Sequence, residues 1–114
     1  MADYETYGES ELEVARTAAL EDDDADVREA AVRAIGRMAE EDDEESANVL
    51  QQALEDSAKG VRIAAARALA DIGNAEDQIL VALEEVLTSR WEAEEVVEAA
   101  KQALLKLTSA DRED

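Results

Sequence analysis

Carboxylates are the most abundant groups in this sequence that could do chemistry. The chain has 31 Asp and Glu among 114 residues, and the densest run is EDDDAD over residues 21–26. An EF-hand loop places oxygen ligands at positions 1, 3 and 5, Gly at 6 and Glu at 12. Alternate aspartates starting at Asp22 fit the first three positions, but Val27 and Arg33 occupy the sixth and twelfth. The run therefore favours a solvated turn that caps a helix over a calcium site.

The residue types needed for most other enzyme chemistry are missing. The chain contains no His and no Cys, which removes the commonest general base, metal ligand and thiolate nucleophile. None of its five serines lies in a nucleophile-elbow context, and no phosphate loop or dinucleotide fingerprint is present. The sequence predicts a protein with no catalytic residues, no metal site and no cofactor.

An internal repeat sets the architecture. VREAAVRAIGRM begins at Val27, VRIAAARALADI begins 34 residues later at Val61, and a weaker copy begins at Val96. Each copy has apolar residues at i, i+3, i+4, i+7, i+8 and i+11, which form one stripe along an α-helix. This spacing predicts helices over residues 27–39, 59–73 and 96–107.

A second set of apolar stripes predicts a helix before each repeated one, over residues 9–20, 44–55 and 75–88. Capping boxes beginning at Ser10, Asp26 and Ser89 fit helix starts, and Gly73-Asn74 fits a helix stop followed by the N-cap of the next helix. Arg16 occupies a position that is Leu in the later units, as expected for an outward-facing end cap. We expect three antiparallel helix pairs, about the number that a stack of such units needs for stability.

Two of the units resemble a known repeat family. LEDDDADVREAAVRAIG (20–36) and LEDSAKGVRIAAARALADIG (54–73) are similar to HEAT-like repeats of the phycobilisome-lyase type, and the likeness covers about residues 9–108. It implies an all-α, right-handed α-solenoid (alpha-alpha superhelix) of three HEAT-like helix pairs, with units at about 9–39, 44–73 and 75–107. The third copy departs from the pattern, because its loop is two residues longer and Val97 replaces the repeated Arg. Residues 1–8 are expected to be a flexible segment and residues 109–114 a polar tail.

The family pattern also suggests roles for the acidic and basic positions that recur. In HEAT-like repeats these positions commonly form an Asp–Arg ladder between units, and here the candidates are Asp22, Arg28, Asp56 and Arg62. Trp91, in the altered third loop, is expected to plug the core of the last unit, with an exposed anchor as the alternative.

The remaining basic residues indicate where a partner could bind. The predicted first helices contain ten acidic residues and one basic residue, whereas the second helices contain three acidic and eight basic. We expect the outward face of the second helices to bind another protein, because Arg and apolar anchors are favoured at interfaces. The candidate residues are Val32, Arg33, Arg37, Ile63 and Arg67. The alternative is that nearby acids, including Glu29 and Asp71, neutralise these arginines.

This pattern predicts a non-catalytic protein-protein interaction or scaffold module, whose partner is not identified and whose self-association stays possible. The alternative is a regulatory or accessory subunit of an enzyme, as the bilin-attaching relatives suggest. Similarity at the level of the repeat implies the fold and not the activity.

The net charge excludes some partners and suggests a setting. A charge of −20 opposes binding to nucleic-acid phosphates, and no apolar run approaches the ~20 residues that span a bilayer. We expect a cytoplasmic protein with no nucleic-acid or membrane partner. Eight Arg against three Lys, small core residues and acid-rich surfaces are typical of cytosolic proteins of salt-accumulating halophiles, here most simply a halophilic archaeon.

The halophile hypothesis predicts that salt stabilises the fold. Raising KCl from about 50 mM to about 2 M shortens the Debye length severalfold and weakens repulsion among the carboxylates. Circular dichroism should show a higher melting temperature and at least equal helix content in the higher salt. Identical helix content and melting temperature in both buffers would contradict the hypothesis.

Overall fold

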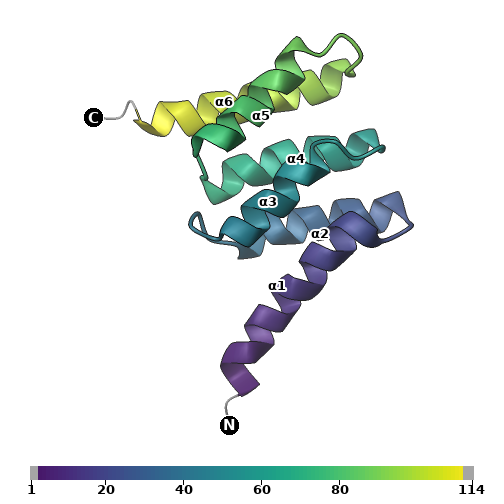
Figure 1. Cartoon of the computed structure of the whole chain (residues 1–114), viewed down its shortest axis with the longest axis vertical. Coiled ribbons are helices and arrows are strands. Elements are labelled where there is room, and N and C mark those ends of the chain that lie inside the picture. The colour runs from purple at the N-terminus through teal and green to yellow at the C-terminus, as the bar shows by residue number, and fades with distance from the viewer. Residues whose placement is uncertain (1–2, 112–114) are drawn as a thin grey trace.

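The chain folds as a stack of three helix pairs. The structure is a computed structural model that describes residues 3–111, and this part of the chain contains helices and no strands. The helices are α1 (Asp3–Glu21), α2 (Ala25–Met38), α3 (Glu44–Ala53), α4 (Lys59–Ile72), α5 (Asp77–Thr88) and α6 (Glu94–Asp111). The pairs follow one another along the longest axis of the molecule (Figure 1). The predicted all-α solenoid of helix pairs is confirmed.

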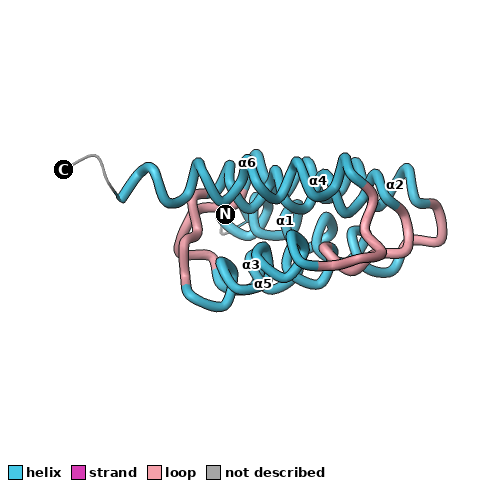
Figure 2. The backbone as a smooth tube through the Cα atoms, turned by 90° about the horizontal axis from the view of Figure 1, so that it is seen from above, coloured by secondary structure: helices cyan, strands magenta, loops and turns pink. Residues whose placement is uncertain are grey.

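The helices form two layers. The first helices of the pairs, α1, α3 and α5, make one layer, and the second helices, α2, α4 and α6, make the other (Figure 2). The molecule measures 50 × 41 × 17 Å, so it is a flat slab two helices thick. Helix α4 packs against α2 on one side, α6 on the other and α3 beneath it, which makes it the centre of the stack.

Small side chains make up much of the core. The chain has 24 Ala and only three aromatic residues, and eight residues of α4 are buried, five of them Ala. Larger side chains fill the space between the layers; those that are fully buried include Ile35, Leu50, Leu69, Ile79 and Leu83. The close approach of helix backbones therefore replaces large rings as the means of excluding water.

Several helix ends differ from the predicted capping boxes. Asp24, not Asp26, caps α2 by accepting a hydrogen bond from the Asp26 N–H, and Asp43 caps α3 by accepting one from the Ser46 N–H. Ser89 lies at the C-terminal end of α5. The predicted stop at Gly73 is confirmed, since this residue has φ 76°, a left-handed conformation that suits glycine.

Asn74 is not the N-cap of α5, contrary to the prediction, and lies in the loop before that helix. Its side chain accepts a hydrogen bond from the Glu76 N–H and donates one to the Glu41 carbonyl oxygen, while Glu76 is the N-cap residue of α5. The Asn74 side chain thereby joins the loop before α5 to the loop before α3.

The two ends of the chain also differ from expectation. Helix α1 begins at Asp3, so residues 3–8 are helical and Ser10 lies within the helix and not at its start. Helix α6 continues through residues 109–111 of the expected tail; residues 1–2 and 112–114 lie outside the described part. The unit boundaries shift accordingly.

Arg16 does not face outward from the end of the stack. Its guanidinium lies 3.1 Å from Glu45 Oε1 and 3.6 Å from Asp43 Oδ2, and it donates a hydrogen bond of 3.3 Å to Ser46 Oγ. The expectation of an outward end cap is therefore wrong. Acceptors at the start of α3 draw the arginine inward, so it ties α1 to the next unit.

The contact between α2 and α4 depends on a glycine. A Cβ added at Gly36 would lie 2.9 Å from Ala68 Cβ and 3.1 Å from Ala68 Cα, so these helices approach too closely for a side chain there. At Gly60 an added Cβ would meet only the flexible carboxylate end of Glu29.

We predict that Gly36→Ala lowers the free energy of unfolding by about 1 kcal/mol. Overpacking costs about 1–3 kcal/mol, which exceeds the ~1 kcal/mol that Ala gains over Gly in helix propensity. Urea denaturation measures the change. Gly60→Ala is the matched control and should be at least as stable as the wild type. A Gly36→Ala protein of undiminished stability would show that the two helices can separate at no cost.

Candidate functional site

The outer surface of α2, α4 and α6 carries two adjacent clefts. One, of about 490 Å³, is lined by side chains of α2 and α4 with Glu95 at its edge. The other, of about 840 Å³, is lined by α4 and α6. We call the residues that line these two clefts the second-helix face. Arg67, Asp71 and Glu95 line both clefts, so the clefts form one continuous surface across the three helices.

Four of the five predicted partner-binding residues meet in the first cleft. Arg33, Arg37, Ile63 and Arg67 all line it. The three arginines are exposed, whereas Ile63 is half-buried and packs against the core. The cleft thus has an apolar patch beside three guanidinium groups, contributed by two successive units.

Val32 does not belong to this surface. Its side chain is fully buried. Helix α2 packs against both α1 and α4, so a wider arc of it is covered than a single apolar stripe requires. The equivalent residue of the next unit, Ala66, is fully buried for the same reason. The prediction that Val32 contacts a partner is wrong.

The arginines of the face differ in their pairing. Arg33 forms an ion pair with Glu29 on the same helix. Within residues 11–109, Arg37 and Arg67 form no ion pair. The alternative that a nearby acid neutralises the arginine therefore holds for Arg33. The guanidinium groups of Arg37 and Arg67 have no carboxylate partner in this part of the chain.

The second cleft contributes residues that sequence reasoning did not select. Leu105 is 54% exposed, and Gln102 and Lys106 lie on the same helix. Lys106 pairs with Asp71 across the cleft at 3.3 Å. The weak third repeat obscured these positions, because its pattern offers no recurring residue to compare.

Charge is separated between the layers. Helices α1, α3 and α5 carry eleven acidic residues and one basic residue, whereas α2, α4 and α6 carry seven acidic and eight basic. The separation is weaker than the predicted helix bounds suggested, because α2 and α6 begin earlier and include more acids. The second-helix layer is nevertheless close to neutral in a chain of charge −20.

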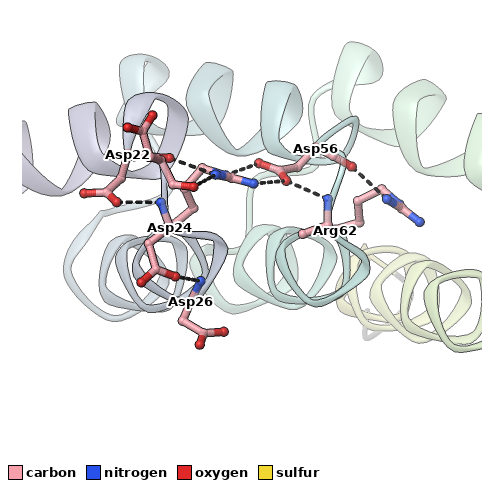
Figure 3. Close-up of polar contacts among 8 residues, drawn as sticks. Asp22, Asp24, Asp26, Asp56 and Arg62 are labelled. Atoms are coloured by element: carbon pink, nitrogen blue, oxygen red, sulfur yellow. Dashed lines mark hydrogen bonds and ion pairs between the residues drawn. The ribbon is translucent and has the colours of Figure 1, made fainter.

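A chain of polar contacts joins the three units near the N-terminal ends of the second helices. Figure 3 shows the part of it that runs from Asp22 to Arg62. Arg28 donates from Nε and Nη2 to the two carboxylate oxygens of Asp56 in the next unit, at 2.8 and 3.0 Å. Its Nη1 also donates to the Asp22 carbonyl oxygen at 2.8 Å. Asp22 thus contributes its main chain, while its carboxylate accepts from the Asp24 N–H.

The same arrangement recurs one unit later with a different acid. Arg62 donates to the Asp56 carbonyl oxygen at 2.7 Å, and its Nε and Nη2 donate to the two carboxylate oxygens of Glu92, at 2.9 and 2.8 Å. Glu92 was not predicted as a ladder residue. Its position one residue closer to the following helix than Asp56, with a side chain one methylene longer, could have signalled this role.

The ladder shifts the pKa of both carboxyl groups. Partial burial raises the pKa of Asp56, but hydrogen bonds from Arg28 and from the Ala58 N–H outweigh it and leave the pKa below its ordinary value. The pKa of Glu92 is likewise lowered, because hydrogen bonds from Arg62 and the Ala93 N–H outweigh the effect of burial. Hydrogen bonding to Asp56 raises the pKa of Arg28. Each charged pair is therefore favoured in the folded state.

Trp91 is not a core plug. Its side chain is 91% exposed in the loop between α5 and α6, and the core of the last unit is closed by residues such as Val96, Ala100 and Leu107.

The remaining candidates were the acidic runs. Asp22 and Asp24 accept hydrogen bonds from backbone N–H groups two residues later, as in a capping turn. Among the described residues no group of three or more Asp, Glu, His or Cys side chains is arranged to hold a metal ion. No helix in this part of the chain is both long and apolar enough to cross a membrane.

Comparison with known proteins identifies the repeat. The family model for HEAT repeats matches residues 12–110, which covers most of the chain. Searches against curated proteins and against solved structures found no match.

We predict that Asp56→Asn lowers the melting temperature at pH 7 by about 5 °C or more, because it removes the carboxylate charge that pairs with Arg28. The folded-state pKa of Asp56 lies below its unfolded value of about 3.9, so the stabilisation is complete above about pH 5 and is lost as pH falls through the folded pKa. The difference between wild type and variant should therefore shrink below about pH 4. Thermal melts at several pH values measure it.

Glu95→Gln is the control for this experiment. It removes a carboxylate from the exposed Lys59–Glu95 pair, where solvent screens the attraction, so a smaller effect is expected. An equal loss in both variants, or an Asp56→Asn effect that does not change with pH, would contradict the role of the ladder.

Proposed function

Because the chain belongs to the HEAT-repeat family, we propose that it is a non-catalytic interaction module that binds a partner protein through its second-helix face. HEAT repeats generally mediate protein-protein interaction, and the finer assignment of the surface is ours. The observation that carries it is the first cleft, where Ile63 lies beside Arg33, Arg37 and Arg67.

The composition of this cleft supports recognition of a protein. Arginine is enriched where proteins bind one another. Three acids, Glu29, Asp71 and Glu95, also line the cleft, and each of them pairs with a basic residue of this chain. Arg37 and Arg67 lack an ion-pair partner within residues 11–109, so both can donate to carboxylates or carbonyls of a partner. A partner segment with an apolar side chain flanked by acidic groups fits this arrangement.

The charge of the chain supports a setting for this binding. A net charge of −20 on 114 residues, with Arg preferred over Lys, suits a salt-rich cytoplasm such as that of a halophilic archaeon. Exposed ion pairs contribute little at high ionic strength. Under such conditions Ile63 and Leu105 supply most of the affinity and the arginines supply orientation.

The proposal predicts that Ile63→Glu with Arg67→Glu abolishes partner binding. The variant places a negative charge on the apolar patch at residue 63. It also replaces the positive charge of Arg67, which lines both clefts, with a negative one. Affinity capture from the native lysate at its own salt concentration, followed by mass spectrometry, measures retention of the partner. Circular dichroism checks that the variant is folded, since Ile63 is half-buried.

Two further variants make the test specific. Val81→Glu with Arg90→Glu makes the same chemical changes at exposed residues that line neither cleft, and it should retain the partner. Arg37→Glu with Arg67→Glu leaves Ile63 in place and should still lose it. Retention of the partner by both cleft variants would overturn the proposal, whereas a co-purifying enzyme or cofactor would favour an accessory subunit.

A further inference from the structure

Trp91 is exposed without a structural reason for being so. It is the chain's only tryptophan, one of three aromatic residues, and its side chain is 91% exposed. An indole in water forgoes the free energy of burial that aromatic side chains otherwise contribute to a core. Its backbone N–H makes a hydrogen bond within the same loop, where it donates to Ser89 Oγ.

The repeat pattern shows how this residue came to lie outside. Counting back five residues from the first valine of each second helix gives Asp22, Asp56 and Trp91. In the third unit the ladder residue is Glu92, which lies four residues before Val96 and pairs with Arg62. Trp91 is thereby released from the contacts that its counterparts make.

A cleft of about 480 Å³ lies beside this loop. Leu54, Ala82 and Val86 provide its apolar lining, and three exposed residues, Glu55, Glu85 and Trp91, also line it. The other charged lining residues, Asp56, Arg62 and Glu92, bind one another in the ladder.

The two outer acids give the cleft its charge. Glu55 and Glu85 are exposed and form no ion pair within residues 11–109. The cleft therefore combines an aromatic face, two free carboxylates and an apolar floor.

We propose that this cleft binds a lysine or arginine side chain from a basic segment of a partner protein. A cation over the face of an indole is attracted by its quadrupole, and Trp is the best aromatic for this. The aliphatic stem of the basic residue packs on Leu54, Ala82 and Val86 while its charged end reaches Glu55 and Glu85. At low ionic strength the net charge of −20 favours the approach of a basic segment, and at high salt the attraction is confined to the short range of the cleft.

This site is separate from the second-helix face. Its lining residues come from α3, α5 and the turns that follow them, together with Arg62, and none of them lines either cleft of that face. The two surfaces also differ in chemistry, because one presents free arginines and the other free carboxylates. Failure of one proposal therefore leaves the other standing.

The single tryptophan makes the test direct. Acetylated and amidated tetralysine is titrated into the full chain at the lowest KCl concentration that preserves full helix content, and Trp91 fluorescence is recorded. The proposal expects a saturable change in the emission, with no change on addition of tetraglutamate. The Glu55→Gln, Glu85→Gln variant should bind tetralysine about fivefold more weakly, because both carboxylates are lost.

A matched control separates this site from general attraction to an acidic surface. Glu40→Gln with Glu84→Gln removes the same charge at exposed residues that do not line the cleft, and its affinity should change less than about twofold. Equal weakening in both variants, or a Trp91 emission that does not respond, would overturn the proposal.

A second measurement keeps the test valid if a variant fails to fold. In the wild type, Trp91 gives one indole N–H resonance in a ¹H–¹⁵N correlation spectrum. Tetralysine should shift this resonance together with backbone signals of Glu55 and Glu85. Shifts spread over the acidic first-helix layer, with the indole signal unmoved, would refute a specific cation site.

Discussion

The short distance between neighbouring second helices is the constraint on which the other features depend. Gly36 lies against Ala68 with no room for a side chain between α2 and α4, and alanines fill most of the buried face of α4. This spacing brings Arg28 within 2.8 Å of the Asp56 carboxylate in the next unit. It also sets the width of the first cleft, since Arg33 and Arg67 approach from opposite helices. A core of larger side chains would separate the helices, lengthen the contact between Arg28 and Asp56 and widen the first cleft.

Among the described residues, the acids of the first-helix layer are mostly unpaired, whereas those of the ladder pair with arginines. Most of the acids of the first-helix layer have no basic neighbour on their own layer, so they repel one another and depend on counterions. The ladder uses its acids and arginines in bidentate pairs with side chains about one-tenth to one-fifth exposed, where screening is weaker. The ladder thus supplies electrostatic cohesion between units that salt does not readily remove, while salt relieves the repulsion outside it.

The sequence predicted features that follow from repetition. The apolar stripe of α4 and the stop at Gly73 follow local rules, and both are present in the structure. In α2 the same spacing fails in part, because Val27 and Met38 are exposed. The Asp–Arg ladder was expected from the resemblance to HEAT-like repeats, and Arg28 pairs with Asp56 of the next unit. The burial of Val32 could not be predicted from the pattern of one helix, because it depends on two neighbouring helices, α1 and α4. The ion pairs of Arg16 could not be predicted either, because its partners Asp43 and Glu45 belong to the next unit. Contacts between units are visible in a sequence only when they repeat.

The third unit is where repetition fails, and it contains the most unexpected side chain. Two more residues separate Leu87 from Val96 than separate Leu54 from Val61. The ladder is nevertheless kept, because Glu92 reaches Arg62 from a shifted position. The longer Glu92 side chain meets the structural requirement, so the residue five positions before Val96 takes no part in the ladder. Trp91 occupies that position and faces solvent beside two unpaired carboxylates. Exposure of a large aromatic side chain forgoes free energy of burial, and the proposed binding of a basic side chain in this cleft would account for it.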